Sequence, residues 1–289
     1  MAATAKHALI FGASGISGWS LLNQTLRYPT ATTFNRVTGL CNRPFRTDDA
    51  LLPDDDRLRI VSGIDLTQPV EAVRALLKDK IDDVESVDVV FFCAYIQTSD
   101  FQSLRKVNTD LLRTAIEAIS AVSSELKAVI LQTGGKGYGL EFPKEIRPDG
   151  IVGIAPGTNA MNMAFGIAFY LTLYREINGK DAKVPFPGRP HGYHTYHTDT
   201  FQDVLAKMEI FAALNRDKYP NGSTFNCGDG EPVTWAQVWP GICSYFGLRG
   251  VEPDEKPRGM EEFVYKHKAA WDSLVEEKRL KKGLVESQN

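Results

Sequence analysis

Three evenly spaced glycines are the residues of this sequence best suited to bind a ligand. They form the run Gly12-Ala-Ser-Gly15-Ile-Ser-Gly18, which follows the apolar segment 7–11 and opens a segment of helical pattern. In that context the first glycine permits a tight turn, the second lets the backbone approach a pyrophosphate, and the third permits close helix–strand packing. The free N–H groups at the start of the helix then attract phosphates. The run predicts a dinucleotide site, with a glycine turn that binds nothing as the alternative.

The end of the second predicted strand indicates which dinucleotide is bound. It continues into Asn42 and Arg43 and lacks the Asp or Glu that usually holds the ribose 2′-hydroxyl of NAD. Arg43, together with Arg46, could instead pair with a 2′-phosphate, so NADP(H) is favoured. An ordinary solvated loop arginine stays open as an explanation. Asp65 and Leu66, after the third strand, are placed to border the adenine, which a surface turn explains nearly as well.

A run of histidines and tyrosines could supply acid–base chemistry. The segment 191–197, HGYHTYH, holds three of the five histidines of the chain. Histidine titrates near neutral pH and a tyrosine hydroxyl can donate to an oxyanion, so Tyr193, Tyr196 and His197 are candidate catalytic residues. No well-placed acid or cysteine completes a metal site, and none is predicted. Ordinary packing on an irregular loop is an equally good explanation of the run.

The first half of the chain must position these groups, and there strands alternate with helices. The predicted strands are 7–11, 36–41, 57–61, 87–95 and 128–132, and the predicted helices are 19–27, 70–80 and 100–126. Apart from Asp88 the run 87–95 is apolar, as in a central parallel strand that is covered on both faces. The alternation predicts an α/β fold with right-handed βαβ units, a Rossmann-type doubly wound parallel sheet.

The second half has a different pattern. The segment 159–178 reads as a helix with apolar residues on nearly all sides, and a Pro/Gly-rich stretch, 184–194, follows it. Further helices are predicted at 200–215, 235–246 and 261–281. The sequence thus predicts a dinucleotide-binding domain over 1–183 and a smaller, mostly helical substrate-binding lobe over 184–289, interleaved with the first domain.

Composition and charge narrow the class of partner. The net charge of −3 argues against a nucleic-acid binder, which would carry a basic patch. The four cysteines lie far apart, which fits a reducing compartment. The predicted strand near the start leaves no room for a signal peptide, and the longest apolar stretch, 160–174, is shorter than a bilayer span. We therefore expect a soluble, cytoplasmic protein with no membrane partner; a homodimer is left open.

Several segments together resemble one family, the progesterone 5β-reductase/iridoid synthase (PRISE) group of atypical short-chain dehydrogenases and its fungal relatives. They occur in the family's order along nearly the whole chain. They are GASGISGWSLL (12–22), LQTGGKGYG (131–139), RPDGIVGIAPGTNAMNMAF (147–165), VPFPG (184–188), FNCGDGEPVTWAQVWPGICSYFGL (225–248) and AAWDSLVEE (269–277). The resemblance implies NADPH-dependent reduction of the activated C=C bond of an enone or enal, a small apolar molecule as substrate, and specialised metabolism as the setting.

The resemblance also assigns catalytic residues. The family's lysine lies in a T-G-x-K-H-Y segment, which Thr133 to Tyr138 matches except that Gly137 replaces the histidine. It implies that Lys136 holds the nicotinamide ribose and places positive charge near the substrate oxygen. The residues expected to contact the cofactor are Gly12, Ser14, Gly15, Ile16, Gly18, Asn42, Arg43, Asp65, Leu66, Ala94, Thr133 and Lys136.

The family's catalytic tyrosine has no counterpart here. It lies in an N-F-Y-Y segment before the strand that begins R-P-D-G, whereas only LEFPKEI separates Gly139 from Arg147 in this chain. Loss of one preorganised oxyanion donor typically lowers the rate by about two to three orders of magnitude. Three hypotheses follow: a reductase that uses a donor from the segment 191–197, a non-redox isomerase or cyclase that keeps the nucleotide pocket, and a nucleotide-sensing regulatory protein.

Overall fold

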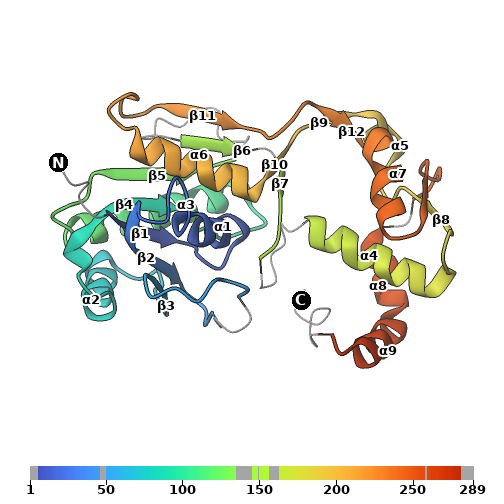
Figure 1. The fold of residues 1–289 in the computed structure, drawn as a ribbon, viewed down its shortest axis with the longest axis horizontal. Helices are drawn as coiled ribbons and strands as arrows, with labels where there is room; N and C mark the ends of the chain where they lie inside the picture. The colour runs from blue at the N-terminus through green and yellow to red at the C-terminus, as the bar shows by residue number, and fades with distance from the viewer. Residues whose placement is uncertain are drawn as a thin grey trace. The chain divides into compact units, whose positions relative to one another are not determined.

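The contacts in a computed structural model divide the chain into two compact units (Figure 1). The structure describes residues 6–45, 50–134, 145–148, 150–155, 163–257 and 259–280. Unit 1 comprises residues 1–151, 155–159 and 200–228, and unit 2 comprises 152–154, 160–199 and 229–289. The predicted boundary at residue 183 does not coincide with this division, because the chain passes from one unit to the other more than once.

Unit 1 is built on a seven-stranded sheet in the order β11-β6-β5-β4-β1-β2-β3, and all of its pairings are parallel. Its strands are β1 (Lys6–Phe11), β2 (Phe34–Cys41), β3 (Leu58–Ser62), β4 (Val87–Phe92), β5 (Ala128–Gln132), β6 (Glu145–Pro148) and β11 (Thr224–Cys227). The strand order reverses between β1 and β4, the place where open parallel sheets bind ligands. The predicted Rossmann-type doubly wound sheet is confirmed.

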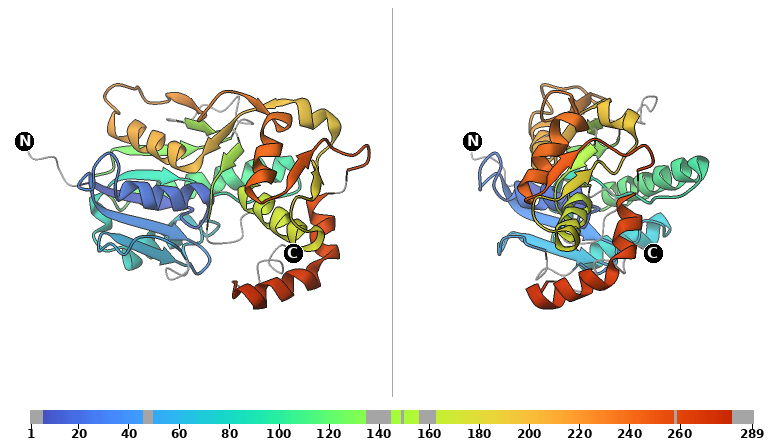
Figure 2. Two further views of the ribbon diagram at one scale, coloured as in Figure 1. Left: turned by 45° about the vertical axis from the view of Figure 1, so that its right-hand side comes forward. Right: turned by 90° about the vertical axis from the view of Figure 1, so that its right-hand side faces the viewer.

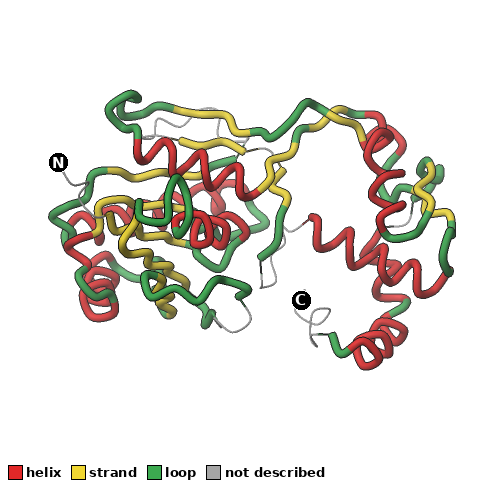
Figure 3. Tube along the Cα trace, in the orientation of Figure 1, coloured by secondary structure: helices red, strands yellow, loops and turns green. Residues whose placement is uncertain are grey.

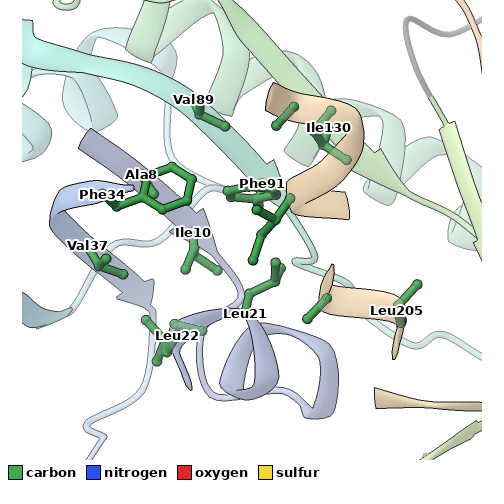
Figure 4. Close-up of a cluster of buried hydrophobic side chains, with 14 of the residues drawn as sticks. Ala8, Ile10, Leu21, Leu22, Phe34, Val37, Val89, Phe91, Ile130 and Leu205 are labelled. Atoms are coloured by element: carbon green, nitrogen blue, oxygen red, sulfur yellow. The ribbon is translucent and has the colours of Figure 1, made fainter. Parts of the chain in front are cut away.

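Helices cover both faces of this sheet (Figures 1 and 2). On one face α1 (Ile16–Thr25) and α6 (Gln202–Leu214) pack against each other and against the sheet, and on the other lie α2 (Val70–Lys80) and α3 (Phe101–Ser120). A 3-10 turn (Val84–Ser86) precedes β4, and every residue of that strand is buried, as its apolar run predicts. Figure 4 shows the core on the α1 face, where Leu21 of α1 points toward Ile10 and Phe91 of the strands; Leu205 of α6 belongs to the same core.

Unit 2 is mostly helical (Figure 3). Its helices are α4 (Met163–Asn178), α5 (Pro190–His194), α7 (Trp235–Tyr245), α8 (Met260–Lys266) and α9 (Lys268–Lys278). Three two-stranded sheets complete the fold: β7 (Gly150–Val152) with β10 (Asp199–Phe201), β8 (Lys183–Pro185) with β13 (Arg249–Val251), and β9 (Tyr196–His197) with β12 (Val233–Thr234). Aromatic side chains form much of the core of unit 2, with Trp239 fully buried at its centre.

Some predicted helix bounds differ from those in the structure. The predicted helix 100–126 ends at Ser120, because residues 121–127 form a turn that leads into β5. The predicted helix 261–281 is two helices, which meet at His267, where the backbone leaves the helical conformation. None of the helices in the described part of the chain combines the length and apolar character that a membrane span needs.

Candidate nucleotide-binding site

The glycine run forms a tight turn between β1 and α1. Gly12 has a φ of +81°, a backbone conformation that residues other than glycine rarely adopt. The N–H groups of Gly12 and Ala13 both donate to the carbonyl of Leu40, at 3.0 and 3.1 Å, and the Gly15 N–H donates to the Gly12 carbonyl at 3.0 Å. The turn is therefore anchored to the neighbouring strand β2 by its own backbone.

Two glycines in this turn have no room for a side chain. A Cβ atom on Gly12 would lie 2.7 Å from the backbone of Cys93, and one on Gly18 would lie 2.2 Å from the Gly12 carbonyl oxygen. Gly18 lets α1 pack directly on the turn, and Gly12 lets the turn pack on the end of β4. This close packing is the role that dinucleotide-binding folds give to their glycines.

The start of α1 is free to bind an anion. Its N-cap residue is Gly15, and among the described residues no side chain caps the helix and no acid lies in its first turn. The N–H groups of that turn carry partial positive charge, so they can hold phosphate oxygens. Ser14 is half-buried beside them, whereas the Ile16 side chain is buried in the core and offers a ligand only its backbone.

The loop after β2 carries the residues predicted to contact the ribose. Asn42 and Arg43 follow the strand directly and are both exposed. The Asn42 carbonyl accepts a hydrogen bond from the Gly63 N–H at 3.0 Å, which fixes the loop beside β3. Arg46 lies outside the described residues.

The structure gives Asp65 and Leu66 local roles. The Asp65 carboxylate accepts hydrogen bonds from the backbone and side chain of Thr67 and from Gln68, and the Thr67 hydroxyl is the main cause that lowers its pKa. The Leu66 side chain is buried in the core on the α2 face. The surface turn therefore explains Asp65, and the predicted contact of both residues with adenine stays a prediction.

The ends of β4 and β5 complete the described part of the site. Ala94 lies against the glycine turn, because its backbone nitrogen would be 2.7 Å from a Cβ on Gly12. The Thr133 hydroxyl oxygen, just after β5, is buried and has no hydrogen-bond partner in the described part of the chain. Nearby, the Cys93 thiol donates to the Gln132 amide oxygen at 3.6 Å. Lys136, the residue implied by resemblance, lies outside the described residues.

The candidate residues of the segment 191–197 are not brought together. Tyr193 ends up in the core of unit 2, where its ring packs 5.2 Å from that of Phe186 and burial raises its pKa. Tyr196 is 69% exposed and alternates along β9 with His197, so the two side chains point to opposite sides of the strand. Of the three, only His197 has the surroundings of a functional side chain.

His197 lies between an aromatic ring and a carboxylate. Its imidazole stacks on the indole of Trp235 with ring centroids 5.0 Å apart and an angle of 24°, and its Nε2 lies 3.4 Å from Oδ2 of Asp199. Both side chains are about three-quarters buried. Sequence reasoning named neither Trp235 nor Asp199. The spacing His-x-Asp, which in extended chain places both side chains on one side, is the signal that could have found Asp199, although the two residues belong to the successive strands β9 and β10.

Comparisons with known proteins agree with this architecture. The solved structure of the terminal R domain from the myxalamid biosynthetic pathway superposes with a TM-score of 0.59 at 14% identity, covering 100% of this chain and 80% of that one, which shows the fold alone. The "short chain dehydrogenase ausT" of Aspergillus calidoustus is 33% identical over 97% of this chain and 81% of its own length. A 3-oxo-Δ(4,5)-steroid 5β-reductase of Arabidopsis thaliana is 24% identical over 96% of this chain and 79% of its own.

The family itself is shown by a family model. The model that describes a PRISE-like Rossmann-fold domain matches residues 8–144 and 142–289. The two matches take in both the glycine turn and unit 2. This chain belongs to the PRISE-like Rossmann-fold family of short-chain dehydrogenase/reductase-type proteins.

Proposed function

We propose that this chain binds NADP(H) and reduces an activated C=C bond, or the C=O bond, of a small apolar enone or enal in specialised metabolism. The observation that carries the proposal is the glycine turn, where backbone packing leaves no room for a side chain at Gly12 or Gly18. The uncapped start of α1 and the unpartnered Thr133 hydroxyl are polar groups that suit a bound dinucleotide. Relatives named short chain dehydrogenases and a steroid 5β-reductase support the reaction class.

Residues of this chain would hold the separate parts of the cofactor. When bound, NADPH supplies the hydride. The N–H groups at the start of α1 would hold its phosphates, Arg43 its 2′-phosphate, and Lys136, by resemblance, its nicotinamide ribose. A proton must then reach the enolate that hydride addition leaves on the substrate, and the family's tyrosine is not available for this step.

We propose His197 as the proton donor. The Oδ2 atom of Asp199 lies 3.4 Å from its Nε2, and the Trp235 ring stacks on the imidazole and restricts its orientation. The alignment with the Aspergillus relative runs over 333 positions, more than the 289 residues of this chain, so part of it consists of gaps on this side. That difference agrees with a missing segment and also supports the second candidate, a non-redox isomerase or cyclase that keeps the nucleotide pocket.

NADPH consumption with a panel of enals and enones separates these functions. We expect NADPH binding and turnover in the wild type, and a loss of kcat of about a hundredfold or more in Lys136→Ala and in His197→Ala, because each removes a group that stabilises the developing charge or moves the proton. His191→Ala is the matched control, since His191 is exposed on the same segment, and it should leave kcat unchanged. NADPH binding without turnover would exclude the reductase and favour the isomerase, the cyclase or a nucleotide sensor.

Cofactor preference is tested at Arg43. We expect Arg43→Ala to raise the Kd for NADPH about ten- to a hundredfold and to leave the Kd for NADH unchanged, because only NADPH carries the 2′-phosphate with which a guanidinium forms charge-assisted hydrogen bonds. Fluorescence titration with both dinucleotides measures this. Arg59→Ala, which removes another exposed arginine of the same unit, is the control. An equal change for both dinucleotides would contradict the assignment of Arg43.

A further inference from the structure

Unit 1 contains a buried acid that the proposed reaction does not use. Glu209 lies in the second half of α6 and its side chain is 0% exposed. Both of its carboxyl oxygens are buried, and neither has a hydrogen-bond partner in the described part of the chain. Buried acids are normally paired or hydrogen-bonded, so this residue requires an explanation.

Among the described residues, the surroundings of Glu209 offer no charge to balance a carboxylate. The elements that pack most extensively on α6 are α1 and β5, and neither contains a charged residue. On α6 itself Asp203 accepts a hydrogen bond from Ser20 and Lys207 is exposed. The thiol of Cys93 is a titratable group close to Glu209. Its pKa is raised well above its ordinary value, mainly by burial and also by the negative charge of the Glu209 carboxylate.

The carboxyl group is therefore uncharged near neutral pH. Burial alone raises the pKa of Glu209 to about 8, because an isolated carboxylate in an apolar core loses its hydration and gains nothing in return. The neutral acid fits among the apolar side chains of this core, whereas the ionised form does not.

The same elements hold the glycine turn. Ser20 of α1 donates to Asp203 of α6 at 2.6 Å, which joins the two helices, and α1 begins at the turn itself. Cys93, which interacts with Glu209, is also the residue whose backbone lies against Gly12. A displacement of α6 would thus disturb both the helix and the strand end that shape the nucleotide site.

We propose that Glu209 is a proton-dependent lock: α6 stays packed against α1 while the Glu209 carboxyl is uncharged, and its ionisation loosens α6 and weakens nucleotide binding. The effect on nucleotide binding rests on the proposed function, whereas the effect on the packing of α6 does not. The direction of the pH effect follows because folding and proton binding by Glu209 are coupled. The pKa is about 8 in the folded chain and near 4.5 in the unfolded chain, so the unfolded state releases its proton first as the pH rises. The stabilisation is complete below pH 4.5 and is lost progressively up to about pH 8.

Denaturant unfolding of the whole chain between pH 5 and pH 9 tests the lock. In the wild type we expect the ratio of folded to unfolded protein, divided by the same ratio in a Glu209 variant, to fall about tenfold for each pH unit between about 5 and about 8. Glu209→Gln and Glu209→Met should both remove this dependence; the second variant leaves no buried amide without a partner. Glu117→Gln, on the exposed face of α3, is the matched control and should keep it. A dependence that persists in both Glu209 variants, or that is missing from the wild type, would overturn the proposal.

Nucleotide titration at pH 7 and pH 9 tests the coupling. If the ionised form does not bind, the Kd for NADPH in the wild type should rise about tenfold between these pH values, and it should stay constant in Glu209→Gln. Cys93 is not expected to contribute, since its thiol titrates well above 9. No NADPH binding at either pH would refute the proposed function but leave the unfolding experiment valid. A constant Kd in a wild type that shows the stability change would refute only the coupling.

Discussion

Replacement of Gly18 by alanine is expected to abolish nucleotide binding at ordinary concentrations and to destabilise unit 1. The new Cβ would lie 2.2 Å from the Gly12 carbonyl oxygen and 2.7 Å from the Ala13 Cα, and real Cβ atoms essentially never approach other atoms within 3.0 Å. Both neighbours are backbone atoms of the turn, so no side-chain rotation can relieve the overlap. The turn or the start of α1 must shift, which we expect to cost about 2–3 kcal/mol or more of folding free energy.

Denaturant unfolding and NADPH titration of the Gly18→Ala variant measure the two effects. Gly166→Ala is a matched control, because it makes the same substitution in the interior of a helix where a Cβ would meet no atom within 4 Å. There alanine should stabilise the chain by about 0.5–1 kcal/mol through its higher helix propensity. Wild-type NADPH affinity in Gly18→Ala would show that the ligand does not approach this turn, and the proposed function would lose its main support.

The parts of the fold that the sequence predicts are those fixed by local pattern. The strand β4, apolar except for Asp88, and the helices that follow β1 and β3 have the pattern of their secondary structure. The glycine turn has a backbone requirement that few other residues meet. The assignment of α6 to the second lobe depended instead on its place late in the chain. Its apolar residues indicate burial but not which core receives them, and in the structure they pack on α1.

The segment 191–197 shows why the surroundings of the candidate catalytic residues were harder to predict. Seven adjacent residues suggest one cluster, but α5 ends at His194 and β9 begins at Tyr196, so the chain changes direction between them. Tyr193 then faces the aromatic core, while the partner of His197, Trp235, is distant in sequence and is brought close because β9 pairs with β12. Non-local pairing of this kind leaves no periodic signal in either segment.

Replacement of Trp239 by alanine is expected to destabilise unit 2 more than any other single truncation of its core. The indole is fully buried, packs edge-on against Phe186 at 5.5 Å, and donates from Nε1 to the carbonyl of Val184 at 3.1 Å. The backbone of Gly250 packs closely on the indole, since a Cβ on Gly250 would be 2.9 Å from the indole Cδ1. Truncation of a buried tryptophan typically costs about 3–5 kcal/mol, and loss of the Nε1–Val184 hydrogen bond adds about 0.5–1.5 kcal/mol.

Trp239→Phe separates the two contributions. Phenylalanine keeps a ring against Phe186 but removes the donor to Val184, so its loss in denaturant unfolding should be limited to about 1–3 kcal/mol. Because Phe186 also contacts Trp235, on which His197 stacks, Trp239→Ala should lower turnover as well as stability, whereas Trp239→Phe should largely preserve turnover. Equal losses in the two variants would mean that the Nε1–Val184 hydrogen bond, rather than the packing of the rings, stabilises this core. Unchanged turnover in a destabilised Trp239→Ala would separate His197 from the aromatic cluster and weaken its assignment as the proton donor.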